Sequence, residues 1–118
     1  MARYQAQLLW SEQNPVAVRQ FLGQLAETLQ CSAEWVDRQT VALPLIHKPS
    51  GLLVQVLLEF QRNKSLVVLV TSHEPMGNSA ANSKQVLEQM LSLMTKLLPQ
   101  AQLVYRSDRD GPVFKARS

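Results

Sequence analysis

The sequence predicts an α+β domain, with one mostly antiparallel sheet of about five strands and two amphipathic helices packed on one face. Residues 51–71 hold two runs in which apolar residues alternate with a period of two, separated by a short polar segment. This pattern is typical of a hairpin with one buried face. Segments 15–30 and 82–98 carry apolar residues at helical spacing. Strands close in sequence usually neighbour in space, so this order of elements favours an antiparallel sheet.

The first two elements are predicted to be a strand over residues 3–10 and a helix over residues 15–30. The strand alternates apolar and polar side chains up to Trp10. Asn14 and Pro15 are typical of a helix start. An Asn side chain at this position accepts a hydrogen bond from the first free backbone donors, and a Pro at the first helical position gives up a donor that has no partner anyway.

Residues 40–46 alternate again and predict a strand that ends near Ile46. Pro44 cannot donate to a neighbouring strand, so this strand lies at an edge or carries a bulge. Trp35 and Val36 either begin the same strand or form a separate short one. Residues 47–51 have the composition of a turn.

The central hairpin is expected in the middle of the sheet because it is so apolar. With the polar residues 62–64 in its turn, the register pairs Phe60 with Leu66, Leu58 with Val68, and Val56 with Val70. Asn63 or Lys64 must then adopt a positive φ, which Asn tolerates better.

The C-terminal third begins with an irregular stretch over residues 72–82. A helix is predicted to follow, with Asn82 as its cap and Gln85 as the capping-box partner. We expect it to end before Pro99. A strand over residues 101–107, a turn at Asp110 and Gly111, and a terminal strand over residues 112–116 complete the chain.

Size and composition indicate a single folded domain over residues 1–118. The chain is 46% hydrophobic and 18% charged, with a net charge of +3, which is typical of a globular protein. It shows neither a leader nor an apolar segment of bilayer length, and its single Cys31 excludes an internal disulfide. We therefore expect a cytoplasmic protein with no membrane contact. No metal or cofactor motif is present, so none is expected.

The surplus of apolar residues predicts self-association. Two helices cover only one face of a sheet, yet the central strands are apolar on much of both faces, and the second helix is apolar over a wide arc. An uncovered apolar face indicates an interface. The residues predicted to form a homodimer or partner interface are Leu53, Leu57, Val67, Leu69, Met90, Leu93 and Met94.

Two polar groups offer alternative sites. His47 and His73 follow strands that end at the same edge of an antiparallel sheet, and Glu74 is adjacent, so acid–base or metal chemistry is conceivable there. The second group is the basic C-terminal hairpin, a possible anion-binding site offset by two nearby aspartates. Its basic residues are Arg106, Arg109, Lys115 and Arg117.

Over residues 15–116 the order of elements resembles the type III secretion chaperone-like superfamily: a helix, a three-stranded meander, a second helix and closing strands. No residue motif carries the likeness. The family's third helix is absent, and the strand over residues 3–10 is extra. The resemblance implies a homodimer that binds a segment of another protein without doing chemistry.

The function expected from the sequence is therefore a non-enzymatic adaptor or chaperone-like module that self-associates and binds a protein partner. The first alternative is a nucleic-acid or regulatory binding module that uses the basic C-terminal hairpin. The last is a small-ligand or metal-dependent enzyme at the His47 and His73 end of the sheet.

Overall fold

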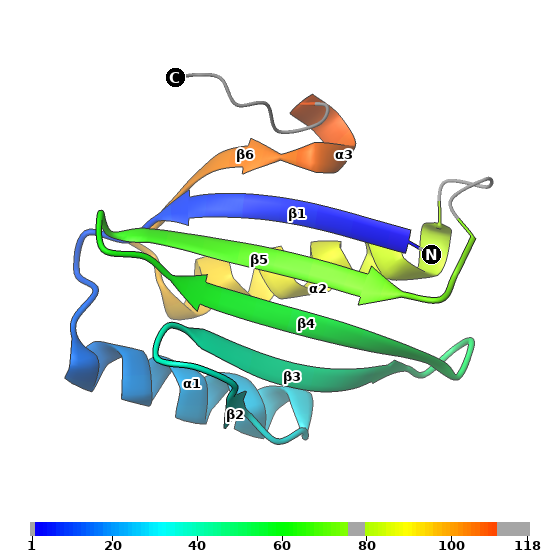
Figure 1. Cartoon of the computed structure of the whole chain (residues 1–118), viewed down its shortest axis with the longest axis horizontal. Coiled ribbons are helices and arrows are strands. Elements are labelled where there is room, and N and C mark those ends of the chain that lie inside the picture. The colour runs from blue at the N-terminus through cyan, green and yellow to red at the C-terminus, as the bar shows by residue number, and fades with distance from the viewer. Residues whose placement is uncertain (1, 76–79, 111–118) are drawn as a thin grey trace.

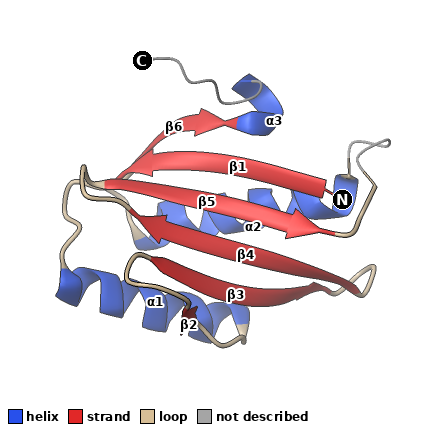
Figure 2. Cartoon of the chain, viewed as in Figure 1, coloured by secondary structure: helices blue, strands red, loops and turns tan. Residues whose placement is uncertain are grey.

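The computed structural model describes residues 2–75 and 80–110. Within them, six strands form one antiparallel sheet, and the two long helices lie on the same face of it (Figure 1) (Figure 2). The strand order is β2 (Glu34–Trp35), β3 (Thr40–His47), β4 (Leu52–Phe60), β5 (Ser65–Ser72), β1 (Ala2–Leu9) and β6 (Gln102–Arg106). The helices are α1 (Pro15–Leu29), α2 (Ala81–Leu97) and the short α3 (Ser107–Asp110). The predicted fold class is confirmed, and the separate short strand β2 accounts for the sixth strand.

The central hairpin has the predicted register. Val56 lies opposite Val70, and the flanking apolar pairs also match. The positive φ of the turn falls on Lys64, at 68°. Asn63 has a different role, because its side-chain oxygen accepts a hydrogen bond of 3.2 Å from the backbone N–H of Ser65.

Strand β1 lies inside the sheet, between β5 and β6. Its predicted alternation is confirmed, and the side chains that point towards the helices are Tyr4, Ala6, Leu8 and, just after the strand, Trp10. Because β1 covers the outer side of β5, the apolar hairpin is held in the middle of the sheet, as expected.

The hydrophobic core lies between the sheet and the two long helices. Trp10, Phe21 and Phe60 connect the sheet to α1 at one end of this core. The rings of Trp10 and Phe21 meet edge-on, with centroids 5.7 Å apart, and those of Phe21 and Phe60 are 6.5 Å apart. The other large and fully buried side chains include Leu25, Leu43, Leu58, Leu66, Leu87, Met90 and Met94.

Strand β3 forms the edge that Pro44 was predicted to require. Strand β2 pairs only with Val41 and Ala42, so among the described strands nothing pairs with the outer side of the rest of β3. On that outer side the Thr40 carbonyl accepts from the N–H of Val36. Alternate residues of a strand direct their backbone groups to the same side. Pro44 therefore directs its nitrogen outward, where it has no hydrogen to offer to another strand.

The two long helices begin in different ways. Helix α1 starts as predicted, with Asn14 Oδ1 accepting from the backbone N–H of Ala17 at 2.9 Å. The predicted start of α2 is wrong. This helix begins at Ala81, and Asn82 already lies inside it. Its free backbone donors are satisfied by a residue from outside the helix, Glu74.

Candidate functional site

The face of the sheet opposite the helices carries the sheet residues that were expected at an interface. Leu57 and Leu69 lie directly opposite each other on β4 and β5, and Leu53 pairs with Ile46 of β3. Ile46 and Leu53 are 64% and 63% exposed, while Leu57, Val67 and Leu69 are half-buried. We call these five residues the open-face cluster, which extends the predicted set by Ile46.

The predicted interface residues of the second helix lie elsewhere. Met90 and Met94 are fully buried beneath the sheet, and Leu93 is half-buried against the same core. The prediction that Met90 and Met94 are available to a partner is therefore wrong. The wide apolar arc of this helix is used to cover the sheet and to contact α1.

His47 is held inside the protein by two hydrogen bonds. Its Nε2 atom lies 2.7 Å from Oε1 of Gln85 on α2, and its Nδ1 atom lies 2.7 Å from Oγ of Ser50. The Gln85 oxygen accepts a hydrogen bond from Nε2, and Nδ1 is paired with the Ser50 hydroxyl. The side chain borders a cavity of about 800 Å³ between α1, α2 and β3. Gln85, which was expected to cap its own helix, instead ties that helix to the end of β3.

His73 does not join His47. It is exposed and lines a small depression on the open face together with Leu53, Gln55 and Thr71. His47 is buried on the helix-covered face at the same end of the sheet. The prediction of a shared site is wrong, because the sheet itself separates the two imidazoles. No group of three or more His, Cys, Asp or Glu side chains in the described part of the chain has the arrangement of a metal site.

Glu74 caps the N-terminus of α2 from the preceding segment. Its carboxylate accepts from the backbone N–H groups of Asn82, at 3.2 Å, and Ser83, at 2.8 Å, and from the Ser83 hydroxyl. The same hydroxyl lies 2.7 Å from that of Ser72, at the end of β5. Partial burial raises the pKa of the Glu74 carboxyl, but the hydrogen bonds from Ser83 and Asn82 outweigh this, and the net pKa is lowered. The predicted catalytic carboxylate thus has a structural role.

This cap predicts how Glu74→Gln changes stability with pH. A carboxyl whose pKa is lowered by folding stabilises the native state above its unfolded pKa, and this contribution is lost as the pH falls through the folded pKa. At neutral pH the variant should therefore have a lower Tm than the parent, and in strong acid the two should converge. Thermal melts followed by circular dichroism across this range measure the difference. Glu27→Gln on exposed α1 is the control, and an offset independent of pH would contradict the charged cap.

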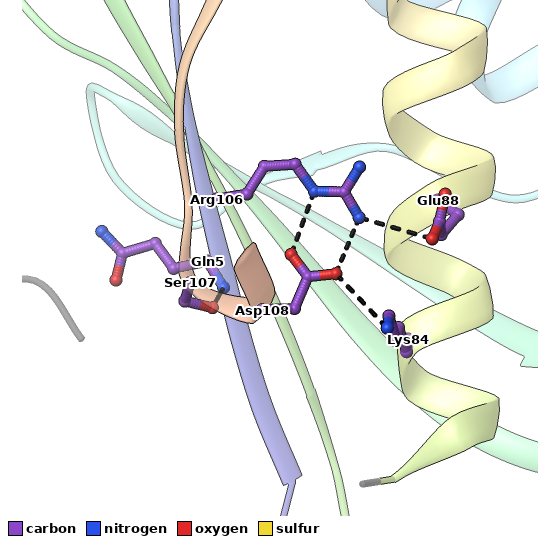
Figure 3. A network of polar contacts seen from close by, with 6 residues as sticks. All are labelled: Gln5, Lys84, Glu88, Arg106, Ser107 and Asp108. Atoms are coloured by element: carbon purple, nitrogen blue, oxygen red, sulfur yellow. Dashed lines mark hydrogen bonds and ion pairs between the residues drawn. The ribbon is translucent and has the colours of Figure 1, made fainter. Parts of the chain in front are cut away.

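Arg106, the one described side chain of the predicted anion site, is already paired. Its Nε and Nη2 atoms donate to the two carboxylate oxygens of Asp108, at 3.0 and 2.7 Å. Glu88 of α2 lies 3.5 Å from the same guanidinium, and Lys84 lies 4.0 Å from Asp108 (Figure 3). This network fastens β6 and α3 to α2, so Arg106 is not offered to an anion as predicted.

The remaining residues of that site lie outside what the structure describes. This applies to the side chain of Arg109, to Lys115 and Arg117, and to the expected strand over residues 112–116. After β6 the described chain forms the short helix α3. The Ser107 hydroxyl at its start accepts a hydrogen bond of 2.9 Å from the backbone N–H of Gln5 (Figure 3). This bond continues the pairing of β1, whose residues 6–9 pair with β6.

A second candidate surface was missed by sequence analysis. It is a groove of about 500 Å³ at the end of the sheet where β4 turns into β5, bordered also by the start of α1 and the β2–β3 turn. We call it the basic–aromatic groove, and its charged and aromatic lining residues are Arg19, Trp35, Arg38, Phe60, Arg62 and Lys64. In sequence these cations look scattered, because the groove assembles them from three separate segments. The available signal was an arginine close to an aromatic residue in two turns: Arg38 follows Trp35 before β3, and Arg62 follows Phe60 after β4.

None of the described helices is long and apolar enough to cross a bilayer. Comparison with known proteins identifies no relative: no protein-family model, no curated protein and no solved structure matches this chain. The resemblance to the type III secretion chaperone-like superfamily therefore stays a prediction from the order of the elements.

Proposed function

We propose that the protein is a non-enzymatic adaptor that pairs with a second copy of itself through the open-face cluster. The observation that carries the proposal is the gathering of Ile46, Leu53, Leu57, Val67 and Leu69 on a face that no described helix covers. Contiguous apolar surface of this kind is uncommon on monomers and is typical of interaction sites.

The face is large enough for a stable pair. Strands β3, β4, β5 and β1 are each eight or nine residues long. With about 4.8 Å between strands and about 3.3 Å per residue, they span a flat area of roughly 500 Å². The accessible surface is larger, because side chains project from this plane. An interface of standard size buries about 800 Å² of accessible surface on each partner. The two areas are of the same order.

Polar residues border the cluster on β1 and divide it on β4. Gln5 lies opposite Leu69, Gln7 opposite Val67, and Gln55 between the two leucines of β4. Carboxamides both donate and accept hydrogen bonds, so they can pair across a two-fold axis that brings the same surface together twice. Interfaces between proteins commonly combine apolar contacts with direct hydrogen bonds in this way.

Pairing through the face is favoured over pairing through the sheet edge. The free edge of β3 is interrupted by the missing N–H of Pro44, and proline at an edge is a common device against strand addition. A second copy that extended the sheet would leave this position unpaired, whereas stacking on the face requires no backbone donor.

An adaptor is favoured over an enzyme by the roles of the candidate catalytic groups. Both ring nitrogens of His47 are engaged, and the Glu74 carboxylate holds the start of α2. Each has a structural partner, and His73 lies on the other side of the sheet from His47. In this proposal the pair of chains, rather than the single chain, is presented to a protein partner.

Sedimentation velocity across the micromolar range tests the pairing. The parent should sediment as a dimer, and Leu57→Lys with Leu69→Lys should give a folded monomer, because like charges and lost burial act only at the interface. Val16→Lys, at an exposed valine of α1, is the matched control and should remain a dimer. A monomeric parent would refute the proposal. A double variant that unfolds would place these two leucines in the core instead.

A further inference from the structure

The basic–aromatic groove concentrates positive charge. Arg19, Arg38, Arg62 and Lys64 line it, and no carboxylate is found among its lining residues in the described chain. The ion pairs of the described residues all belong to the network around Arg106 and Asp108. The four cations of the groove therefore have no ion-pair partner among the described residues, and all four are exposed.

The carboxylates nearest in the sheet lie away from the groove. Glu59 is opposite Val67 and Glu34 is opposite Ala42, so both side chains are on the open face. Asp37 holds the β2–β3 turn, where its Oδ1 accepts hydrogen bonds of 2.8 Å from the backbone N–H groups of Gln39 and Thr40. The charged side chains in the lining of the groove are thus all cations, with the Asp37 carboxylate held just outside it.

Trp35 supplies an aromatic surface beside these cations. Its ring lies 6.0 Å from that of Phe60, which is buried and anchors it to the core. The Trp35 side chain nevertheless remains 48% exposed. A large aromatic ring that is supported on one side and open on the other is a stacking platform for a planar ligand.

The segments that border the groove are held in place by the fold. The backbone N–H of Phe60 donates to the Gln39 carbonyl at 2.8 Å, which fastens the β2–β3 turn to β4. Lys64 is fixed at its carbonyl, which accepts from the N–H of Trp10 at 2.8 Å, and its ammonium donates to the Gln13 carbonyl at 2.7 Å. The groove is therefore a preformed surface.

We propose that the basic–aromatic groove binds single-stranded nucleic acid, with a base stacked on Trp35 and the adjoining phosphates on the surrounding cations. Every base offers a flat face, and several phosphates in succession require several cations, which is what the groove presents. The carboxamides of Gln39 and Gln61, also in the lining, can donate to and accept from base edges. A duplex keeps its base faces stacked inside, so it cannot use Trp35.

This site is independent of the proposed pairing. The groove lies at one end of the sheet beside α1, whereas the open-face cluster lies on the other face. Pairing through that face leaves both grooves accessible, and two linked grooves strengthen binding to a long strand. A dimer that binds no strand would overturn only the present inference, and a monomer that binds would overturn only the pairing.

Fluorescence anisotropy of the full chain with labelled single-stranded RNA and DNA of about 12 nucleotides tests the inference. This length lies within the roughly 4–16 nucleotides that single-strand-binding OB-fold domains cover. We expect binding by either strand to weaken roughly 50-fold between about 50 and 200 mM salt if four phosphates are neutralised. Trp35→Ala should weaken binding by roughly 5- to 150-fold, and Trp35→Phe should restore most of it. Arg38→Gln with Arg62→Gln should reduce the salt slope by about 1.4.

The charge-matched control is Lys48→Gln with Lys96→Gln, two exposed cations outside the groove and off the open face, and it should leave the slope unchanged. The inference is overturned if neither strand binds at low salt, or if the control weakens binding as much as the arginine pair does. Unchanged affinity in Trp35→Ala would also overturn it. Binding of AMP as tightly as of the strand would reassign the groove to a free nucleotide, and equal binding of a duplex would reduce it to a charge effect.

Discussion

Leu58→Asp should abolish the fold. Leu58 is fully buried in the middle of β4, between Val41 of β3 and Val68 of β5. A carboxylate there has no hydrogen-bond donor to replace water, and burying it costs several kcal/mol. A domain of this size is stabilised by only about 5–15 kcal/mol in total. The variant should lose its cooperative thermal transition, as followed by circular dichroism.

The matched control is Val16→Asp on α1, at a valine that is 55% exposed and lies away from the open-face cluster. It should melt cooperatively near the temperature of the parent, because its carboxylate stays in water. If Leu58→Asp also retained such a transition, the assignment of the core to the helix-covered face would be wrong.

Phe21→Ala should cost about 3–5 kcal/mol of the free energy of unfolding. Phe21 is the central ring of the buried aromatic group and contacts both Trp10 and Phe60 edge-on. Its removal leaves a cavity where α1 meets the sheet, and the lost ring contacts add to the loss of buried area. Urea denaturation at equilibrium measures the change.

Phe21→Leu is the companion variant, since it keeps most of the buried volume while removing the ring. We expect it to lose clearly less stability than the alanine variant. Equal losses in the two variants would show that the aromatic contacts, rather than the filled volume, stabilise this end of the core. A small loss in both would contradict the placement of Phe21 in the core between α1 and the sheet.

Local patterns predicted the central hairpin and the first helix well. In the hairpin, the apolar rows on both sides of a short polar turn leave one register that brings them to the same face, and Val56 does lie opposite Val70. Asn14 and Pro15 likewise mark the start of α1 through interactions within four residues. In both cases the residues that determine the structure are neighbours in sequence.

Features that join distant segments could not be read in the same way. The cap of α2 comes from Glu74, which belongs to the segment before the helix, so the cap pattern at Asn82 was misleading. The two histidines lie at the same end of the sheet, one ending β3 and the other following β5. Which face each side chain points to depends on its position in the alternation of its strand. The basic–aromatic groove is assembled from α1 and two turns, and Trp35 alone does not reveal which cations it will meet.

The position of β1 has a consequence for the order of folding. This strand is synthesised before both of its neighbours in the sheet, residues 65–72 and 102–106. Closing such long loops is entropically costly before any contact compensates, and sheets rich in distant pairings fold slowly, typically in milliseconds to seconds. Until β6 arrives, one side of β1 is an unpaired edge that can pair with another nascent chain. Strand β6 therefore protects a strand that is synthesised well before it.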